Sequence, residues 1–210
     1  MSEKVDNKDP TAKLDLRRYF LRKYHADGTA NVLDCCQGSA LLWRKLRSEF
    51  DIRSYWGMDL KPKKGRLKLD SRKLLAQRGW SQNVVDIDTY GSPWSHWQGV
   101  MENAIGPCSI FLTIGNQANT AISPNAHGFG LMFRLPESTP EMIKGKIARQ
   151  VDVQFFLGNA GKYGTIVEAK EALSSGTARY IGVRFVPKRE ADDVSTGLEH
   201  KQSVKENAHV

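Results

Sequence analysis

The chain has 210 residues, of which 40% are hydrophobic and 26% charged, and a net charge of +8. These values suit one globular domain with a sizeable core. The sequence has no run of about 18 apolar residues, so no membrane span is expected. The polar N-terminus lacks the apolar centre of a signal peptide. Three cysteines, two of them adjacent, argue against a disulfide framework and indicate a reduced, cytoplasmic protein.

The first predicted element is a basic amphipathic helix from Thr11 to about His25. Leu14, Leu21 and Tyr24 recur at helical spacing on one side, and the Arg and Lys residues are expected elsewhere. The pair Asp27-Gly28 is expected to end this helix.

Short apolar strands and helices then alternate along one domain, expected over 11–187, between flexible or disordered ends at 1–10 and 188–210. A long loop over 116–136 is interpreted as either a substrate lid or a surface excursion. The expected strands are ANVLDCC, SYWGMDL, RLKLD, NVVDID, CSIFLTIGN and ARYIGVRFVP, and the expected helices cover ALLWRKLRSEF, Ser71 to about Gln77, about Ser95 to Asn103, and roughly Pro140 to Leu157.

This alternation predicts an α/β fold with an open parallel sheet covered by helices on both faces. Ligands of such sheets bind beyond the carboxyl ends of the strands. Four of the first five expected strands end in a carboxylate, at Asp34, Asp59, Asp70 and Asp88. That pattern indicates a polar ligand held by hydrogen bonds.

The first strand-to-helix turn, VLDCCQGSA, has the character of a cofactor turn. Gly38 lets the backbone approach a ligand, and Asp59, at the end of the next strand, is placed to grip a ribose diol. An ordinary tight connection is the alternative. The expected cofactor-binding residues are Asp34, Cys35, Cys36, Gly38, Ser39, Asp59, Leu60, Asp70 and Ser71.

The glycine pattern separates two cofactors. An NAD-type site needs G-x-G-x-x-G/A, and two of its three glycines are missing here. The turn resembles that of class I S-adenosylmethionine-dependent methyltransferases, with Asp34 as the acid, Gly38 as the middle glycine, and Cys36 and Ala40 in place of the other two. The resemblance implies S-adenosylmethionine as cofactor, Asp70 and Ser71 near its adenine, and a Rossmann-like, mostly parallel sheet of six or seven strands.

The fourth strand carries a second resemblance. VDIDTYGSP is similar to the motif D-[IL]-D-P-[FY]-G-[ST]-P of tRNA guanine-N2 dimethyltransferases, with Thr89 in place of the proline. The resemblance implies that Asp88 and the Thr89 carbonyl accept the two N–H groups of an exocyclic amine, while Tyr90 stacks on the base. Asp86 points to the same side of the strand and is expected to support the site from below. A helix-capping acid beside a core tyrosine is the alternative.

The basic residues are concentrated in one segment. From Arg44 to Arg78 there are twelve Lys and Arg against four Asp and Glu, a local excess of +8 that equals the net charge of the chain. The segment is interpreted as a phosphate-binding surface, with a solvated face as the alternative. The residues expected to bind nucleic acid are Lys61, Lys63, Lys64, Arg66 and Trp94.

The resulting hypothesis is a methyltransferase acting on a nucleobase amine in RNA or DNA. Two alternatives stay open: the same reaction on a protein or a small molecule, and a nucleic-acid-binding protein that keeps the fold without catalysis. Target selection is expected to involve a homodimer or a specificity partner. No metal site is expected, because Cys35 and Cys36 have no partner at metal-ligand spacing.

Overall fold

The computed structural model describes residues 10–61, 67–89, 92–114, 153–154, 156–173 and 178–188. Its strands are β1 (Ala30–Asp34), β2 (Ile52–Asp59), β3 (Leu67–Lys68), β4 (Val84–Ile87), β5 (Cys108–Ile114), β6 (Gly164–Leu173) and β7 (Arg179–Pro187). Its helices are α1 (Thr11–Tyr24), α2 (Leu41–Glu49), α3 (Ser71–Leu75), α4 (Trp94–Asn103) and the 3₁₀ helix η1 (Ala160–Lys162).

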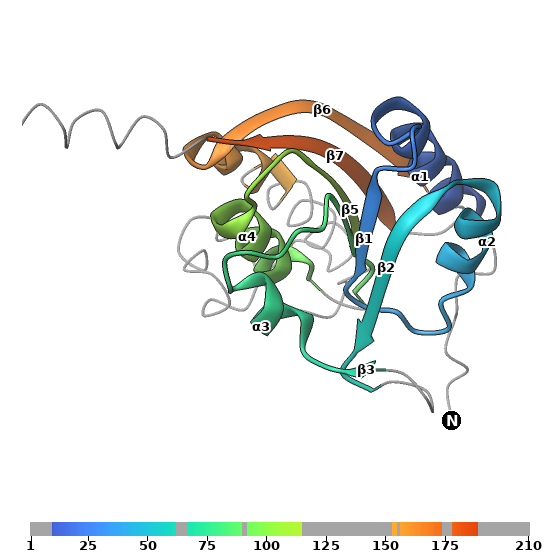
Figure 1. The fold of residues 1–210 in the computed structure, drawn as a ribbon. Coiled ribbons are helices and arrows are strands. Elements are labelled where there is room, and N and C mark those ends of the chain that lie inside the picture. The colour runs from blue at the N-terminus through green and yellow to red at the C-terminus, as the bar shows by residue number, and fades with distance from the viewer. Residues whose placement is uncertain are drawn as a thin grey trace, which may run out of the picture.

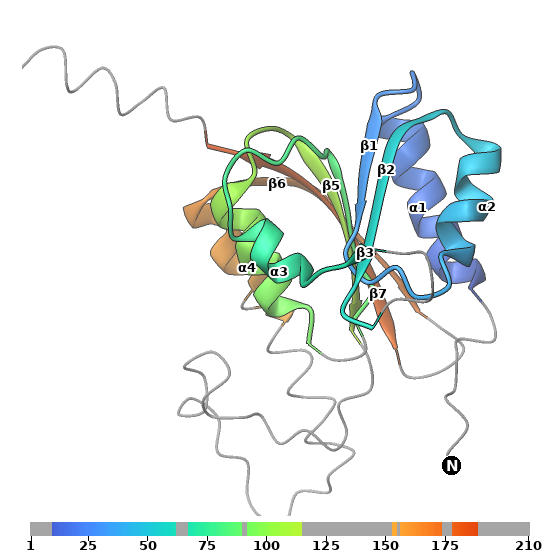
Figure 2. The ribbon, with the colours of Figure 1, turned by 60° about the horizontal axis from the view of Figure 1, so that its bottom comes forward.

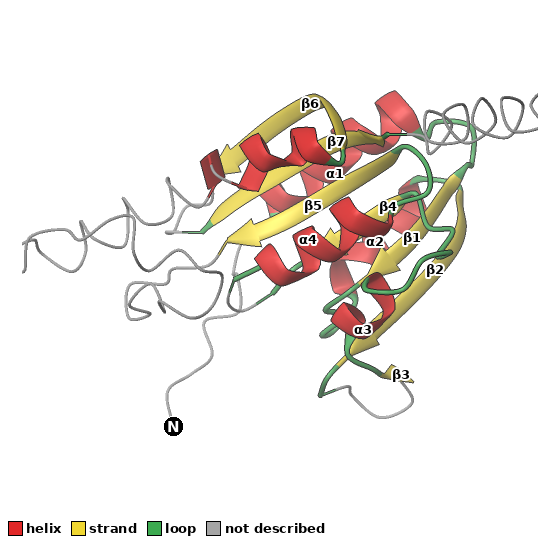
Figure 3. Ribbon diagram, turned by 90° about the vertical axis from the view of Figure 1, so that its left-hand side faces the viewer, coloured by secondary structure: helices red, strands yellow, loops and turns green. Residues whose placement is uncertain are grey.

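The strands form a single seven-stranded sheet in the order β3-β2-β1-β4-β5-β7-β6 (Figure 3). Pairing is parallel from β3 to β5, whereas β7 is antiparallel to both β5 and β6. The order reverses between β1 and β4, which lie side by side with Asp34 in register with Asp86. Such a switch point is where open α/β sheets bind their ligands.

Helices cover both faces of the sheet. Helices α1 and α2 lie on one face, and α3 and α4 lie on the other (Figures 1 and 2). One core cluster includes Phe20, Val32 and Phe111 on the α1 side, and the other includes Leu33 and Ile110 on the α4 side. The central strands β4 and β5 are buried along their whole length, as their apolar sequences predict.

The sequence-based prediction of a mostly parallel sheet with helices on both faces is confirmed. The strand β6 was not predicted, because its segment TIVEAKEAL mixes β-branched residues with the strong helix formers Ala, Glu and Lys. The segment forms a strand because it pairs with β7 along its length. The loop predicted over 116–136 and most of the helix predicted over 140–157 lie outside the described residues, although residues 156–159 are helical.

Helix α1 differs from its prediction in the direction of two basic side chains. Lys13 and Arg17 were expected on the outer side, but both are buried against the sheet together with Leu14 and Leu21. A buried cation requires an anionic partner, because desolvation of an unpaired charge is costly. The partners of both residues lie on β4 and directly after it.

Candidate active site

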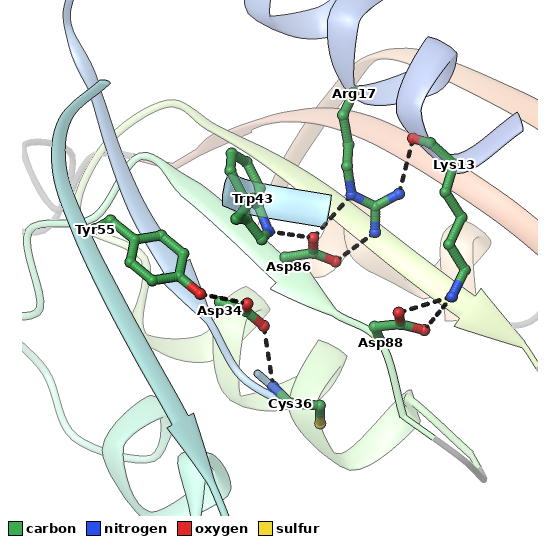
Figure 4. A network of polar contacts seen from close by, with 8 residues as sticks. All are labelled: Lys13, Arg17, Asp34, Cys36, Trp43, Tyr55, Asp86 and Asp88. Carbon is green, nitrogen blue, oxygen red and sulfur yellow. Dashed lines mark hydrogen bonds and ion pairs between the residues drawn. The ribbon is translucent and has the colours of Figure 1, made fainter. Parts of the chain in front are cut away.

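Asp86 is the most deeply buried acid of the site. It lies on β4 and is 2% exposed, and its two carboxylate oxygens accept hydrogen bonds of 2.8 and 2.6 Å from Nε and Nη2 of Arg17 (Figure 4). Trp43 Nε1 of α2 donates a third bond, of 2.6 Å, to Asp86 Oδ2. Arg17 Nη1 also donates to the carbonyl of Lys13 at 3.0 Å. The ion pair is therefore bidentate and well supplied with partners, as burial demands.

Asp88 lies two residues further on, directly after the carboxyl end of β4. Its side chain is 33% exposed, and both of its carboxylate oxygens lie 2.7 Å from Lys13 Nζ. The Lys13 side chain is itself buried, and its Nζ lies 5.1 Å from the centre of the Tyr180 ring of β7. The cation thus approaches from inside the molecule, and the acid retains a face toward solvent.

These contacts form a ladder between one helix and one strand. Lys13 and Arg17 are four residues apart and therefore lie on the same face of α1 (Figure 4). Asp86 and Asp88 are two residues apart in an extended chain, so their side chains point to the same face of the sheet. Asp86 is more deeply buried than Asp88, as the sequence indicates, and its role in supporting a site stays a prediction. Burial by itself lowers the pKa of Arg17, but the carboxylates of Asp86, Asp88 and Asp34, with Asp86 foremost, together offset that effect and raise it.

Asp34 ends β1 next to this ladder. Its carboxylate accepts hydrogen bonds from Tyr55 Oη at 2.7 Å and from the backbone N–H of Cys36 at 3.3 Å (Figure 4). Burial, reinforced by the charge of Asp86, raises its pKa to about 7. The structure therefore places Asp34 behind the Gly38 turn, where it accepts from the backbone of the turn.

The turn after β1 is held open by its backbone conformation. Gly38 has a φ of +47° and Ala40 has a φ of +56°, and both values lie in the left-handed region. A Cβ at Gly38 would meet only the Cys36 carbonyl, at 3.8 Å, so the outer side of the turn has room for a ligand. The side chain of Gln37 instead folds back over Gly57 of β2, where a Cβ would clash with it.

Asp59 joins the end of β2 to this turn. Its carboxylate accepts hydrogen bonds from the backbone N–H groups of Gly38 at 3.0 Å and of Lys61 at 2.9 Å. The neighbouring Leu60 is 54% exposed and adds an apolar surface next to this acid. Asp59, Leu60 and Gly38 thus gather at one edge, as the sequence predicts.

Asp70 and Ser71 begin α3 and have mainly local roles. Asp70 caps the helix by accepting from the N–H of Arg72 at 3.0 Å and pairs with the guanidinium of Arg72 at 2.7 Å. The Ser71 hydroxyl is buried, donates to the Cys35 carbonyl at 2.9 Å, and lies 2.9 Å from Nε2 of His96. Ser71 therefore joins the turn after β1 to His96 of α4.

The prediction for Trp94 needs correction. Its side chain is 1% exposed, and its ring stacks on Phe156 with the ring centres 4.4 Å apart. A ring that is buried in the core offers no face to a nucleobase, so Trp94 packs α4 against the molecule. Cys35 is also buried and presents only its backbone to the turn, whereas Cys36 and Ser39 are partly exposed.

Of the remaining predicted residues, two lie within the described part of the chain and four lie outside it. Lys61 is exposed after β2, and Thr89 follows Asp88 in a half-buried position. Lys63, Lys64, Arg66 and Tyr90 lie outside the described residues. An open hollow of about 520 Å³ on the outer face of α1 is lined by Asp15, Tyr19, Arg22 and Lys23, none of which belongs to the predicted site.

Sequence analysis missed four residues of the site: Lys13, Arg17, Trp43 and Tyr55. One signal was available, namely two basic residues four apart on the apolar side of a helix. No signal of that kind identifies Trp43 or Tyr55, because an aromatic residue in a helix or strand usually serves the core. Their polar atoms find Asp86 and Asp34 only after the sheet has formed.

The described residues give no sign of a metal site or of a membrane-spanning helix. They contain no group of three or more His, Cys, Asp or Glu side chains arranged to hold a metal ion. None of their helices combines the length and the apolar character needed to cross a membrane.

Comparison with known proteins gives likeness in structure alone. No protein-family model matches the chain, and no curated protein matches it in sequence. Trm1 from Pyrococcus horikoshii, solved with S-adenosyl-L-methionine, aligns with a TM-score of 0.59 and 14% identity, covering 88% of this chain and 57% of that one. The chain therefore spans little more than half the length of that protein.

Two further structures have shorter chains that the alignment nearly fills. A candidate hemolysin from Lactococcus lactis has a TM-score of 0.55, 12% identity, and coverage of 87% of this chain and 89% of its own. The N-methyltransferase NodS from Bradyrhizobium japonicum, solved with S-adenosyl-L-homocysteine, aligns with a TM-score of 0.50 and 10% identity. The alignment covers 88% of this chain and 90% of that one. The fold is that of class I methyltransferases, as predicted, and identities this low establish the fold alone.

Proposed function

We propose that this protein transfers a methyl group from S-adenosylmethionine to an exocyclic amine of a nucleobase in RNA or DNA. The observation that carries the proposal is the placement of two partly exposed carboxylates on a methyltransferase-type sheet. Asp59 lies beside the open turn at Gly38, and Asp88 lies at the end of β4. Asp59 can accept hydrogen bonds from the hydroxyls of a ribose, and Asp88 can accept them from an amine.

The donors and acceptors at the turn fit S-adenosylmethionine. Each oxygen of Asp59 accepts one backbone N–H and keeps a second lone-pair position, so the carboxylate can also accept from the two hydroxyls of a ribose. Leu60 supplies an exposed apolar surface next to it, suited to an adenine ring. Asp34 and Ser71 would act through the backbone that they hold, since both are buried.

When bound, S-adenosylmethionine supplies the methyl group: its carbon–sulfur bond breaks as a bond to the acceptor nitrogen forms, and that nitrogen releases a proton to solvent. The task of the protein is to orient the amine. A nucleobase amine is a poor nucleophile because its lone pair is delocalised into the ring. Asp88 and the Thr89 carbonyl would accept its two N–H groups and direct the lone pair toward the methyl group.

Two observations favour a second candidate, a nucleic-acid-binding protein with this fold and no catalysis. Both oxygens of Asp88 already bind Lys13, at 2.7 Å. Thr89 also replaces the proline of the motif that the segment resembles. Tight binding of S-adenosylmethionine without transfer to any acceptor would favour this candidate.

The test combines calorimetry with transfer of a tritiated methyl group to separate pools of RNA, DNA, protein and metabolites. Asp59→Ala is expected to weaken cofactor binding about ten- to a hundredfold, because a hydrogen bond to a charged group contributes roughly 1.5–3 kcal/mol. Asp15→Ala, which removes an exposed acid of α1, is the matched control. Unchanged binding by Asp59→Ala would remove this assignment.

Asp88→Ala tests the acceptor half of the site. It is expected to keep cofactor binding while methyl transfer falls about a hundredfold, equivalent to roughly 3 kcal/mol of activation free energy. Transfer at the wild-type rate would exclude Asp88 as the residue that orients the amine. Transfer to protein or metabolites with none to nucleic acid would reassign the substrate.

A further inference from the structure

The contact between Lys13 and Asp88 has a consequence for the kind of amine that the site accepts. The Lys13 side chain is 5% exposed and that of Asp88 is 33% exposed, so solvent reaches the acid while the cation is buried. Figure 4 shows Lys13 reaching Asp88 from α1. A ligand that reaches Asp88 therefore meets a carboxylate that already has a permanent counter-ion. Lys13 is not exchanged easily, because leaving Asp88 would strand a buried ammonium group.

The charges of the cluster balance one to one. Arg17 pairs with Asp86, and Lys13 pairs with Asp88. Asp34 is the remaining acid, and it is buried behind the pair, with its carboxylate accepting from Tyr55 and from the Cys36 N–H. At the exposed edge of the cluster, the acid that a ligand can reach is Asp88, and Lys13 already balances its charge.

We propose that Lys13 is a specificity-determining residue, which makes Asp88 an acceptor for neutral amines and disfavours alkylammonium groups. This inference rests on the proposed function and deepens it. Lys13 occupies one lone-pair position on each oxygen of Asp88, and the remaining positions can accept N–H groups from a neutral amine. A cationic amine at the same place would lie beside the ammonium of Lys13, where like charges repel.

The same contact favours the reactive form of the acceptor. An uncompensated carboxylate stabilises the protonated form of a nearby amine, by the attraction that favours charged groups beside opposite charges. A protonated amine has no lone pair for the methyl group. By neutralising Asp88, Lys13 removes that stabilisation while leaving the hydrogen-bond acceptors in place.

The experiment measures the binding of two probes in the presence of saturating S-adenosylhomocysteine. The neutral probe is 2-aminopurine riboside, followed by its fluorescence, and the cationic probe is n-butylammonium, followed by competition. Wild type is expected to prefer the neutral probe. Lys13→Met should shift the ratio of the two dissociation constants toward the cation by about tenfold or more, since it uncovers the charge of Asp88.

Three variants control for a merely structural effect. Lys13→Arg keeps the charge and should retain the wild-type ratio, and Lys23→Met removes an exposed lysine of the same helix and should not alter it. Lys13→Gln keeps a hydrogen-bond donor without the charge, and should shift the ratio in the same direction if the methionine variant fails to fold. A loss of packing alone would weaken both probes together.

A ratio that stays within about twofold of wild type in both neutral variants would overturn the proposal, and so would a wild type that binds neither probe. The methyl-transfer assay separates this result from the proposed function. Transfer to nucleic acid with an unmoved ratio leaves the function and removes the role of Lys13. A shifted ratio without any transfer leaves the role of Lys13 in binding and removes the function.

Discussion

Asp34 and Asp86 lie next to each other on adjacent strands, and the two carboxylates are satisfied differently. Asp86 has a cationic partner in Arg17, whereas Asp34 has only the Tyr55 hydroxyl and a backbone N–H. Burial and the charge of Asp86 therefore raise the pKa of Asp34 from 3.8 to about 7. The folded protein keeps this proton to a higher pH than the unfolded chain does. Asp34 thus lowers the free energy of unfolding as the pH rises from about 4 to about 7.

Replacing Asp34 by Asn should remove this pH dependence. The Asn side chain has the same shape, and it can accept from Cys36 and donate to Tyr55. The free energy of unfolding of Asp34→Asn relative to wild type should rise between pH 4 and pH 7, by on the order of 4 kcal/mol at most, and then level off. Urea unfolding at a series of pH values measures the difference.

Other titrating groups contribute equally to the free energy of unfolding of wild type and of Asp34→Asn, so their contributions cancel in the difference. Burial lowers the pKa values of His25 and His96 to about 4, and these residues make both proteins less stable as the pH falls below about 6.5. A difference between wild type and Asp34→Asn that stays constant over the whole range would show that Asp34 titrates in the folded state as it does in the unfolded chain.

Arg17 supports a second prediction at this scale. Arg17→Met should lower the free energy of unfolding by about 3–5 kcal/mol, because it leaves Asp86 buried without its cation. Adding Asp86→Asn should recover part of that loss, since the amide oxygen still accepts from Trp43 and carries no charge. Arg18→Met, on the outer side of α1, should cost less than about 1 kcal/mol. A double variant no more stable than Arg17→Met would contradict this account.

At the scale of elements, α1 carries the cations of the site, and the strand β6 holds α1 in place. Glu168 of β6 accepts hydrogen bonds from the hydroxyls of Tyr24 at 2.6 Å and Tyr19 at 2.7 Å, and from Lys23 at 2.9 Å. These bonds, led by that of Tyr24, lower the pKa of Glu168 to about 2. The far end of α1 is thus anchored by an edge strand, while its first turns reach the end of β4.

Weakening this anchor should loosen the helix without replacing any residue of the site. Glu168→Gln is expected to speed hydrogen exchange at the amides of α1, because a neutral amide binds the two tyrosines and the lysine less strongly. Glu171→Gln is the matched control, since Glu171 pairs with Arg179 within the hairpin of β6 and β7. Equal exchange in the two variants would show that core packing alone holds α1.

Six of the seven described strands and the Gly38 turn could be predicted from sequence, because they follow from local patterns, whereas β6 could not. Buried runs such as CSIFLTI form strands of the sheet, and the residue after each strand falls at its carboxyl end. The role of α1 could not be predicted in this way. The partners of Lys13 and Arg17 are about seventy residues away, and only the packed sheet brings them together. Helical periodicity describes α1 and does not identify the strand that it covers.

At the scale of the whole molecule, the net charge of +8 arises from a single segment, residues 44–78, and the remainder of the chain sums to zero. Lys61 of this segment is exposed directly after β2, at the edge where Asp59 and Leu60 lie. The segment would therefore bring a polyanion to the same edge as the proposed cofactor site. The electrostatic contribution to binding a nucleic acid is measured by its salt dependence, because each neutralised phosphate releases counter-ions.

Replacing Lys61, Lys63 and Lys64 by Gln should flatten that dependence. If all three contact phosphates, the slope of log K against log salt should fall by about 2 to 3, at roughly 0.7–0.9 per contact. Fluorescence anisotropy of a labelled oligonucleotide over a series of salt concentrations measures it. The control replaces Lys162, Lys170 and Lys188, which are exposed outside the segment, and changes the net charge equally. Equal slopes for the two triple variants would mean that total charge, and not this edge of the sheet, attracts the polyanion.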